Sequence, residues 1–453
     1  MKRKIILSAI IALITVCAFA QRHGYEYHWL NLGITEDLSS SAVISWATYS
    51  DSDATVAQIA PMCITPKVAE NATDVPVQTV FVDACERFDK SYPAAYWHKA
   101  YFTGLTPETQ YLYRIGDGKK WSEWCEFKTA AKGSKPFKFI YFGDVQDRIM
   151  DVYPRVARKA FTMAPDAAFV TFVGDLTSGH THGEFEDFFE ANSWMLKQMP
   201  VSVIADWHEH DWITADKGEI THLWQNMFTY PDDAPEAATK EGMYSFVCQD
   251  CLFISIDMAF LNTDEQNRGA TVEWLENVLK DNKCTWIVVA QHQPFYSTGR
   301  VGRHEVNHFS TPVKELYAKY GVDLIISGHD HQYSRFTEKE GGKSVTPVET
   351  VTQAGGKCYI PLYNSHADRI GTGTQNFQIV EVSSKQLVYK AYTADGALYD
   401  SFIIKNRNGK KKFVDAAQGI PEKTDLDYTS ANDKKNESQA LENKAAYESR
   451  KRK

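Results

Sequence analysis

From residue 138 onward, this 453-residue sequence contains five short, almost continuously apolar runs, which constrain the fold more than any other feature. The runs are KFIYF (138–142), AAFVTFV (167–173), VSVIA (201–205), TWIVVA (285–290) and VDLIIS (322–327). Such runs are typical of strands that are buried on both faces of a sheet. Amphipathic stretches between them predict helices at 152–163, 184–199, 270–280 and 312–320. This alternation predicts an α/β layered domain over residues 136–404, with β-sheets flanked by helices.

Residues 22–132 have a different pattern. SAVISWATY (41–49) and AYWHKAYFTGL (95–105) alternate between apolar and polar residues, and GDG (116–118) marks a turn. Short alternating strands with regular turns predict an N-terminal all-β sandwich.

The two ends of the chain are distinct again. A basic start, an apolar run and the small-residue site AFA (18–20) predict a signal peptide over residues 1–20. We therefore expect an exported protein that is periplasmic, attached to the cell surface or secreted. Residues 405–453 are polar and charged, which predicts a flexible or partly helical tail.

Charge and hydropathy limit the partners. The net charge of −9 argues against a nucleic-acid partner, which needs a basic surface. No segment after the signal peptide is apolar enough to predict a membrane span. The sequence indicates no particular oligomeric state.

Each of the five apolar runs ends in residues that bind metals or transfer protons. In chain order these endings are Gly143-Asp144, Gly174-Asp175, DWHEHD (206–211), Gln291-His292 and Gly328-His329-Asp330-His331. In α/β sheets, ligands bind beyond the carboxyl ends of the strands. One Gly-Asp pair is usually a turn, but five such endings in succession predict a single functional site.

The ligand types indicate the chemistry. Carboxylate oxygens and imidazole nitrogens suit iron, zinc or manganese. A carboxylate able to bridge, together with several histidines, predicts a pair of divalent or mixed-valence metal ions. Two adjacent ions stabilise the attacking and leaving oxygens of a phosphoryl transfer, which predicts a hydrolase acting on a small phosphorylated substrate.

The order GD, GD, (GN)H, VxxH, GHxH resembles the calcineurin-like metallophosphoesterases, and specifically the purple acid phosphatase branch. HKAYFTGLTPETQYLYRIGDGKKWSEWCEFKT (98–129) is similar to the end of that branch's fibronectin type III-like N-terminal domain, and VTQAGGKCY (351–359) to its glycine-rich return strand. The resemblance covers nearly all of the chain from residue 22 to about residue 400. It implies an acid phosphatase-like hydrolase in which a metal-held hydroxide attacks phosphorus.

The resemblance also implies roles for individual residues. Asp144 and His331 would hold the first metal, Asp175 would bridge both, and His292 and His329 would hold the second. His208 would contact the substrate phosphate and steady or protonate the leaving oxygen, so that His208 and Asp175 are the expected catalytic residues.

This sequence departs from the family pattern at two ligand positions. The tyrosine of purple members is replaced by Ser178, so that a ferric-tyrosinate colour is not expected. The histidine that the wider superfamily places two residues after the first aspartate is replaced by Gln146, which is a candidate for weak ligation or for orienting a water.

Two alignments of residues 206–211 remain open against the family's Gly-Asn-His-Glu/Asp. Without a gap, Trp207 takes the place of the asparagine ligand, and Asp206 or Glu209 has to compensate, because an indole only donates hydrogen bonds. With a two-residue insertion, Glu209 becomes the ligand and His210 follows it.

Three further histidines are candidates for metal or substrate contacts: His180 and His182 after Asp175, and His304 after the His292 loop. Ordinary loop histidines would have the same pattern. The sequence thus predicts an exported phosphomonoesterase with two metals. A phosphodiesterase or nucleotide hydrolase on the same site, and a degenerate protein that binds a phosphorylated or glycan ligand without turnover, remain alternatives.

Overall fold

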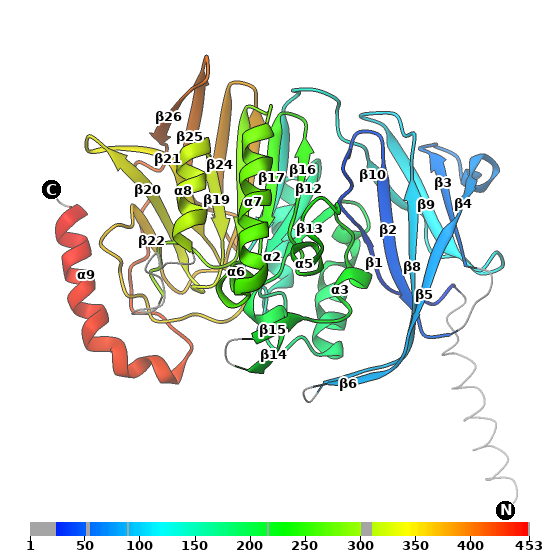
Figure 1. Ribbon diagram of the computed structural model, residues 1–453, viewed down its shortest axis with the longest axis horizontal. Helices are drawn as coiled ribbons and strands as arrows, with labels where there is room; N and C mark the ends of the chain where they lie inside the picture. The colour runs from blue at the N-terminus through cyan, green and yellow to red at the C-terminus, as the bar shows by residue number, and fades with distance from the viewer. Residues whose placement is uncertain (1–23, 51–54, 88–89, 215–216, 300–309, 452–453) are drawn as a thin grey trace, which may run out of the picture.

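The computed structural model describes residues 24–50, 55–87, 90–214, 217–299 and 310–451. Its chain forms a β-sandwich that is followed by a larger α/β unit (Figure 1). The expected signal peptide and His304 lie outside the described residues.

The sandwich consists of two antiparallel sheets with the strand orders β1-β2-β8-β5 and β10-β9-β3-β4. The strands are β1 (His28–Leu32), β2 (Ala42–Thr48), β3 (Val56–Pro61), β4 (Thr73–Val75), β5 (Val77–Val82), β8 (Ala95–Phe102), β9 (Gln110–Gly116) and β10 (Cys125–Lys128), with a short η1 (Val68–Asn71). Alternate side chains, including Ile44, Trp46 and Phe102, fill the space between the sheets. The alternation in the sequence therefore encodes the predicted sandwich.

A hairpin of β6 (Cys85–Arg87) and β7 (Lys90–Tyr92) extends from one end of the sandwich (Figure 1). The sandwich also packs on the α/β unit through aromatic rings. Trp29 stacks on Phe189 with ring centroids 5.7 Å apart, and Trp97 lies 5.1 Å from Trp29. These rings and Tyr92 belong to the same buried cluster as the first helices of the α/β unit.

Two seven-stranded sheets form the centre of the α/β unit, with the orders β13-β12-β11-β23-β24-β25-β26 and β16-β17-β18-β19-β21-β20-β22. The first contains β11 (Phe137–Phe142), β12 (Phe169–Val173), β13 (Val201–Ile204), β23 (Asn376–Ser383), β24 (Gln386–Thr393), β25 (Leu398–Arg407) and β26 (Lys410–Asp415). The second contains β16 (Tyr244–Cys248), β17 (Cys251–Ile256), β18 (Trp286–Gln291), β19 (Leu324–Ser327), β20 (Tyr333–Glu340), β21 (Lys343–Val351) and β22 (Arg369–Gly371). A separate hairpin pairs β14 (His210–Thr214) with β15 (Lys217–Ile220).

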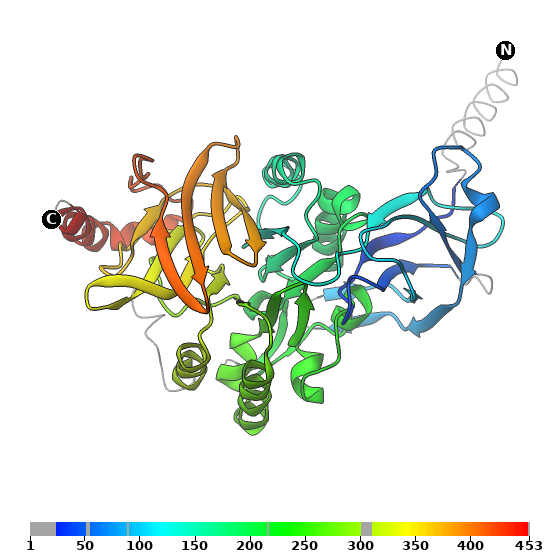
Figure 2. The same ribbon diagram turned by 90° about the horizontal axis from the view of Figure 1, so that it is seen from above.

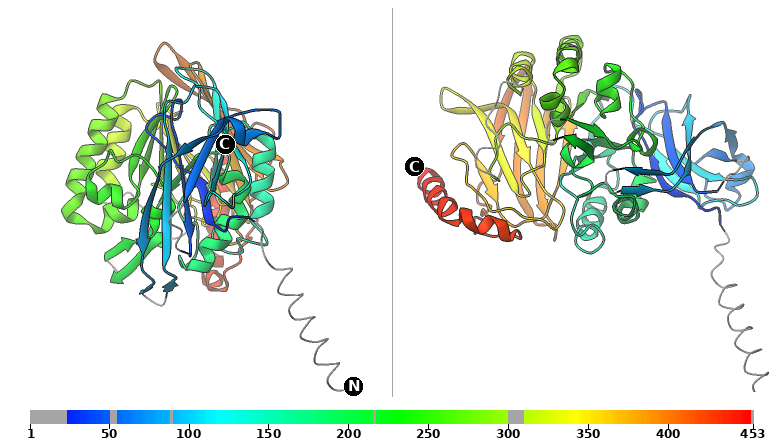
Figure 3. Two further views of the ribbon diagram at one scale, coloured as in Figure 1. Left: turned by 90° about the vertical axis from the view of Figure 1, so that its right-hand side faces the viewer. Right: turned by 60° about the horizontal axis from the view of Figure 1, so that its bottom comes forward.

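Helices cover the outer faces of both sheets, as Figures 2 and 3 show. They are α2 (Pro154–Met163) and α3 (His182–Leu196) on the first sheet, and α6 (Met258–Thr263), α7 (Glu265–Asp281) and α8 (Ser310–Tyr320) on the second, with short turns at η2 (Trp207–Glu209), α4 (Trp224–Met227) and α5 (Glu236–Lys240). The four predicted helices correspond to α2, α3, α7 and α8. Helix α7 begins earlier than expected because the Asp264 side chain accepts the Asn267 N–H at its start.

Successive residues of the apolar runs enter different layers. Phe139 and Tyr141 of β11 point between the two sheets, whereas Ile140 and Phe142 pack under α2 and α3. Both faces of the strand are therefore buried, which explains why the runs are continuously apolar. The predicted fold class is confirmed.

The C-terminal region is partly helical, as expected, but it is not a solvated tail, so that part of the prediction for residues 405–453 is wrong. Strand β26 pairs with β25, and η3 (Ala431–Asn436) leads into α9 (Glu437–Lys451). Tyr447 of α9 is buried against Tyr363, and Ala440 against Leu362. The composition is polar, but a few apolar anchors are enough to pack the helix.

Among the described residues, no helix is long and apolar enough to cross a membrane.

Candidate metal centre

The predicted site residues meet where parallel strands end. Strand β12 is parallel to β11 and β13 in the first sheet, and β18 is parallel to β19 in the second. The loops after these five strands therefore emerge at the same edge of the two stacked sheets.

Asp144, Asp175 and His331 form the most compact group. One ligand atom of each lies within 4.8 Å of the others, and all three side chains are buried. His331 Nε2 is 3.5 Å from Asp144 Oδ1. These residues come from three separate loops, so the group depends on the arrangement of both sheets.

His292 joins this group from β18. Its Nδ1–H donates to the Val173 carbonyl at 2.6 Å, and this fixes the ring with Nε2 toward the carboxylates. Nε2 lies 3.3 Å from Asp175 Oδ1 and 3.9 Å from Asp144 Oδ1. The half-buried His329 ring is perpendicular to His292, with centroids 5.1 Å apart.

The group leaves several buried polar atoms without hydrogen-bond partners, namely Asp175 Oδ1, His292 Nε2 and His331 Nδ1. An unpaired buried polar atom costs about 1–3 kcal/mol, so such a cluster requires an explanation. Carboxylate oxygens and imidazole nitrogens are the donors that transition metals prefer. The residues present therefore fit bound metal ions.

The charges of the buried carboxylates also favour a bound metal ion. Burial, followed by the nearby Asp175, raises the pKa of the Asp144 carboxyl. Burial would also raise the pKa of Asp175, but the charges of His292 and His208 outweigh it and hold that pKa below its usual range. Two buried carboxylates this close favour a bound cation.

The backbone at the site is strained. Asp144, Asp175, His329 and His331 all have positive φ, at 46°, 52°, 75° and 52°. Such conformations cost of order 1–3 kcal/mol each in residues with a side chain, and they cluster at functional sites. At Gly328, an added Cβ would lie 2.5 Å from Asp144 Oδ2, so only glycine permits this approach.

Residues 206–211 adopt the arrangement of the ungapped alignment. The buried Glu209 carboxylate accepts the backbone N–H groups of Asp175, Leu176 and Asp206 at 3.2, 2.8 and 3.1 Å. Glu209 therefore connects two of the site loops. His208 lies immediately before it and faces the centre, with Nε2 3.9 Å from Asp175 Oδ2.

His210 turns away from the centre. Its Nε2 hydrogen-bonds with Asp257 Oδ2 at 2.7 Å and lies 3.5 Å from Glu241 Oε2. Burial lowers the pKa of His210, but the two carboxylates more than compensate and raise it to about 9. The gapped alignment, which makes His210 the family histidine, does not agree with this geometry. Nothing in the sequence marked Asp257 or Glu241.

Asp206 is buried beside His292. Its Oδ1 accepts hydrogen bonds from the Trp207 N–H at 2.6 Å and from Gln293 Nε2 at 2.9 Å, whereas Oδ2 has no partner. Burial raises the pKa of Asp206 to about 6. The Trp207 side chain is 43% exposed at the rim. Of these two neighbours, Asp206 is the one with an oxygen available for a metal.

Gln146 and Ser178, at the two altered family positions, contact each other. The Ser178 hydroxyl donates to Gln146 Oε1 at 3.1 Å, and the Gln146 amide donates to Asp175 Oδ2. The same amide nitrogen lies 3.3 Å from His331 Nε2. Gln146 thus contacts two members of the group of ligands, Asp175 and His331.

A chain of contacts positions His208. Its Nδ1–H donates to the Ser178 carbonyl at 2.6 Å, and the His180 ring Nδ1–H donates to the His208 carbonyl at 2.8 Å. The Tyr92 hydroxyl of the β6–β7 hairpin donates to the His180 carbonyl. His180 therefore supports His208 and links it to the sandwich.

His182 belongs to the interface between the sandwich and the α/β unit. Its Nε2 lies 2.6 Å from the Tyr49 hydroxyl, and its ring lies 5.1 Å from that of Trp29. It is not part of the group of ligands.

Two residues near the centre had no individual signal in the sequence. The Tyr359 ring lies edge-on against His331, with centroids 4.5 Å apart, and the Lys357 ammonium lies 5.1 Å from the Tyr359 ring. They follow Gly355-Gly356, so the glycine pair was the one available indication of a close approach.

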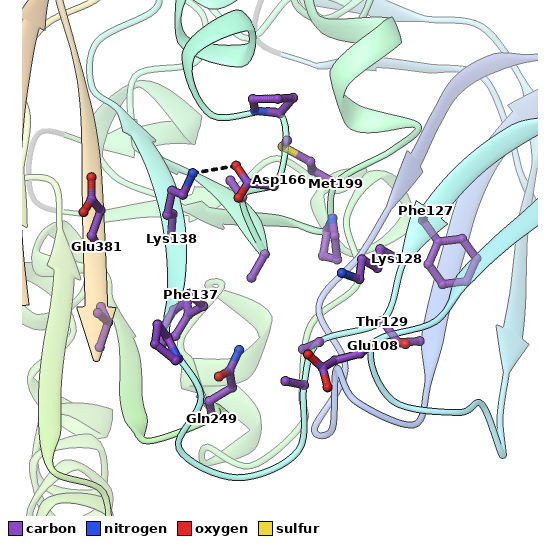
Figure 4. Close-up of a pocket in the computed structure, with 18 of the residues that line it drawn as sticks. Glu108, Phe127, Lys128, Thr129, Phe137, Lys138, Asp166, Met199, Gln249 and Glu381 are labelled. Carbon is purple, nitrogen blue, oxygen red and sulfur yellow. Dashed lines mark hydrogen bonds and ion pairs between the residues drawn. The ribbon is translucent and has the colours of Figure 1, made fainter. Parts of the chain in front are cut away.

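A cavity of about 730 Å³ lies at the opposite edge of the first sheet, between the sandwich and the α/β unit (Figure 4). Its lining includes Phe137 and Lys138 at the start of β11. The Lys138 ammonium is paired with Asp166 at 2.6 Å. The volume of this cavity exceeds that of a small molecule, but none of the predicted metal-binding residues lines it.

Comparison with known families agrees with this architecture. Residues 29–129 match the purple acid phosphatase N-terminal domain, and residues 137–333 match the calcineurin-like phosphoesterases.

Relatives in sequence include an uncharacterized protein of Mycobacterium tuberculosis, which is 25% identical over 360 residues. That match covers 71% of this chain, and the chain spans only 65% of the mycobacterial protein. Fe(3+)-Zn(2+) purple acid phosphatase 12 of Arabidopsis thaliana is 23% identical over 327 residues, covering 70% of this chain and 68% of that protein.

A solved purple acid phosphatase from yellow lupin (Lupinus luteus) seeds superimposes with a TM-score of 0.72 at 17% identity, covering 90% of this chain and 78% of that one. A structure of PhoD gives a TM-score of 0.62 at 14% identity, covering 94% and 99% of the two chains. At these identities the likeness concerns the fold.

Proposed function

We propose that this chain, which belongs to the calcineurin-like metallophosphoesterases in their purple acid phosphatase-like branch, hydrolyses phosphate monoesters with two bound metal ions. The observation that carries the proposal is the buried group of Asp144, Asp175, His292 and His331. It combines adjacent carboxylates with imidazole nitrogens that have no hydrogen-bond partner in the protein.

In this proposal Asp144 and His331 hold the first ion, Asp175 is shared, and His292 and His329 hold the second. When bound, such a pair of ions stabilises charge on the attacking and leaving oxygens of an in-line displacement. The donors suit iron, zinc or manganese. With Ser178 in place of a tyrosine, we expect no ferric-tyrosinate colour.

Two of this chain's own residues complete the ligand set. The family's asparagine ligand supplies an amide oxygen, and the Trp207 side chain has no such acceptor. Asp206 Oδ2, which has no hydrogen-bond partner, takes over this role. Gln146 supplies an oxygen to the first ion if its amide is turned over, which would leave the amide nitrogen to donate to Ser178. The orientation of such an amide follows its partners.

His208 is the proton donor to the leaving oxygen. The Ser178 carbonyl accepts from Nδ1, so Nε2 is the nitrogen presented to the centre. The side chain is 31% exposed, so that a substrate can reach it. General acid catalysis of this kind contributes about 10²–10⁴-fold.

The test uses metal-stripped protein with an aryl phosphate, titrated separately with zinc, manganese and ferrous iron. We expect turnover to return with metal, and bound metal to raise the melting temperature of the protein. His292→Ala should lose both effects. Folded protein that gains neither turnover nor thermal stability with any metal would contradict the proposal.

A second candidate function is binding of a phosphorylated ligand without turnover. It is favoured by the changes at Trp207, Ser178 and Gln146, three positions where the family supplies metal ligands. Phosphate binding that persists after metal removal, with no hydrolysis by metal-loaded protein, would establish this alternative.

We also propose export, which rests on the signal peptide pattern of residues 1–20. The mature protein should then begin near Gln21, which N-terminal sequencing of the protein isolated from its native host would determine. A chain that retains Met1 in that protein would contradict export by cleavage.

A further inference from the structure

The loop after β21 passes directly against the loop that follows β11 and carries Asp144. The Gly355 N–H donates to the Asp144 carbonyl at 2.8 Å, and the Gly356 N–H donates to the Asp147 carbonyl at 3.1 Å. A Cβ at Gly355 would collide with the backbone oxygens of Asp144 and Gln146. The glycine pair therefore brings residues 357–359 next to the metal centre.

The C-terminal region fixes the other side of this loop. Cys358 exchanges hydrogen bonds with Thr429, at 3.0 Å from its N–H to the hydroxyl and at 2.9 Å from the Thr429 N–H to its carbonyl. The Ile360 N–H donates to Asp433 Oδ2 at 3.0 Å. The loop is thus held on both sides, and its side chains have defined positions.

Lys357 is the cation that this loop presents. Its ammonium lies 5.1 Å from the centroid of Tyr359, and the Tyr359 ring lies edge-on against His331. Through these two contacts the ammonium is placed next to the group of ligands.

Within the described part of the chain, Lys357 forms no ion pair, although its side chain is half-buried. Other lysines of the α/β unit are paired, such as Lys339 with Asp368 at 2.7 Å and Lys423 with Asp427 at 2.7 Å. A half-buried ammonium that is not neutralised, beside a centre that attracts anions, is available to a ligand.

We propose that Lys357 binds a nonbridging oxygen of the substrate phosphoryl group and makes the site prefer a doubly charged monoester to a singly charged diester. This inference rests on the proposed function and specifies its substrate class. The second negative charge of a monoester adds a charge-assisted contact that a diester makes more weakly, and partial burial limits screening by salt.

The experiment compares kcat/KM for an aryl phosphate monoester and for the matching bis-aryl diester, with metal-loaded protein. The variants are Lys357→Met, which keeps the length of the side chain, and Lys357→Arg, which keeps the charge. Lys119→Gln, on an exposed turn of the sandwich, controls for the general loss of a positive charge.

We expect Lys357→Met to lower kcat/KM for the monoester about 10- to 100-fold, the range for a lost charge-assisted hydrogen bond, and for the diester by less than about threefold. Lys357→Arg should recover most of the monoester activity. The inhibition constant of inorganic phosphate should rise in Lys357→Met in proportion. Lys119→Gln should match the wild type.

Equal losses on both substrates, or no loss on the monoester, would overturn the assignment while leaving the proposed function intact. If the wild type hydrolyses neither substrate, the proposed function fails, and calorimetric titration of metal-loaded protein with inorganic phosphate tests Lys357 alone. An unchanged phosphate Kd in Lys357→Met would then overturn this inference as well.

Discussion

Both domains bury histidine, but they satisfy it differently. In the sandwich, His98 is 1% exposed, and both ring nitrogens lie 2.9 Å from threonine hydroxyls, of Thr48 and Thr79. In the α/β unit, His292 Nε2 and His331 Nδ1 are equally buried and have no hydrogen-bond partner. Burial alone therefore does not identify a site. Buried donor and acceptor atoms without partners do identify a site, because the free-energy cost of leaving them unpaired is retained where a ligand is needed.

Charged groups differ in the same way at the two edges of the first sheet. At the edge with the cavity of Figure 4, Lys138 forms an ion pair with Asp166, whose side chain is 67% exposed. At the other edge, Asp144 and Asp175 are buried side by side. The cavity therefore does not coincide with the buried charges, which lie at the other edge of the sheet.

The largest expected effect is at the bridging position. Asp175→Asn should lower kcat by about 10³-fold or more, because an amide cannot replace a shared carboxylate between two cations. The fold should survive, since the change also removes one of two adjacent buried negative charges. Circular dichroism and turnover measured on the same preparation check both parts. Asp166→Asn, at the opposite edge, is the matched control and should keep full activity; a similar loss there would break the comparison.

For His98, whose two ring nitrogens both have partners, we expect an effect on stability rather than on turnover. Burial lowers the pKa of His98 from 6.5 to about 4, so the folded state keeps it neutral while the unfolded state protonates it. The unfolded state therefore binds more protons between these values, and the free energy of unfolding falls as the pH drops from about 6.5 to about 4. The loss reaches up to about 3 kcal/mol.

Denaturant unfolding of wild type and His98→Gln across this pH range checks the prediction. The variant starts less stable, because it loses the fit between Thr48 and Thr79, but its stability should depend less on pH. Parallel pH profiles for the two proteins would show that His98 does not carry the effect.

The smallest effect is expected at the cavity. Lys138→Gln breaks an ion pair whose carboxylate is 67% exposed, and exposed pairs contribute about 0–1 kcal/mol. We expect a change of that size in the free energy of unfolding and no change in kcat/KM. A loss of turnover would mean that this edge participates in function, although Lys138 is already paired with Asp166 there.

The sequence predicted the fold well where burial on both faces leaves a simple signature. Strands such as β11 and β18 are continuously apolar because their alternate residues enter different layers. The strand-end rule then located Asp144, Asp175, His292 and His331 together, since parallel strands of stacked sheets end at one edge.

The parts that depend on contacts between distant segments were not predictable. Glu209 looked like a candidate ligand until its three backbone contacts were known. His180 and His182 had the same pattern as metal ligands, but the His180 ring donates to the His208 carbonyl, and the His182 ring contacts Tyr49 of the sandwich. The packing of α9 rests on a few apolar residues, including Tyr447, that a composition average does not register.

The contact from Tyr92 through His180 to His208 has a consequence for the modularity of this protein. The expected boundary between the two domains, near residues 132–136, does not separate the sandwich from the site, because the sandwich supplies the last contact in the chain that positions His208. A domain swap that kept both folds but replaced the β6–β7 hairpin would therefore leave the group of Asp144, Asp175 and His331 in place and remove a contact that positions His208.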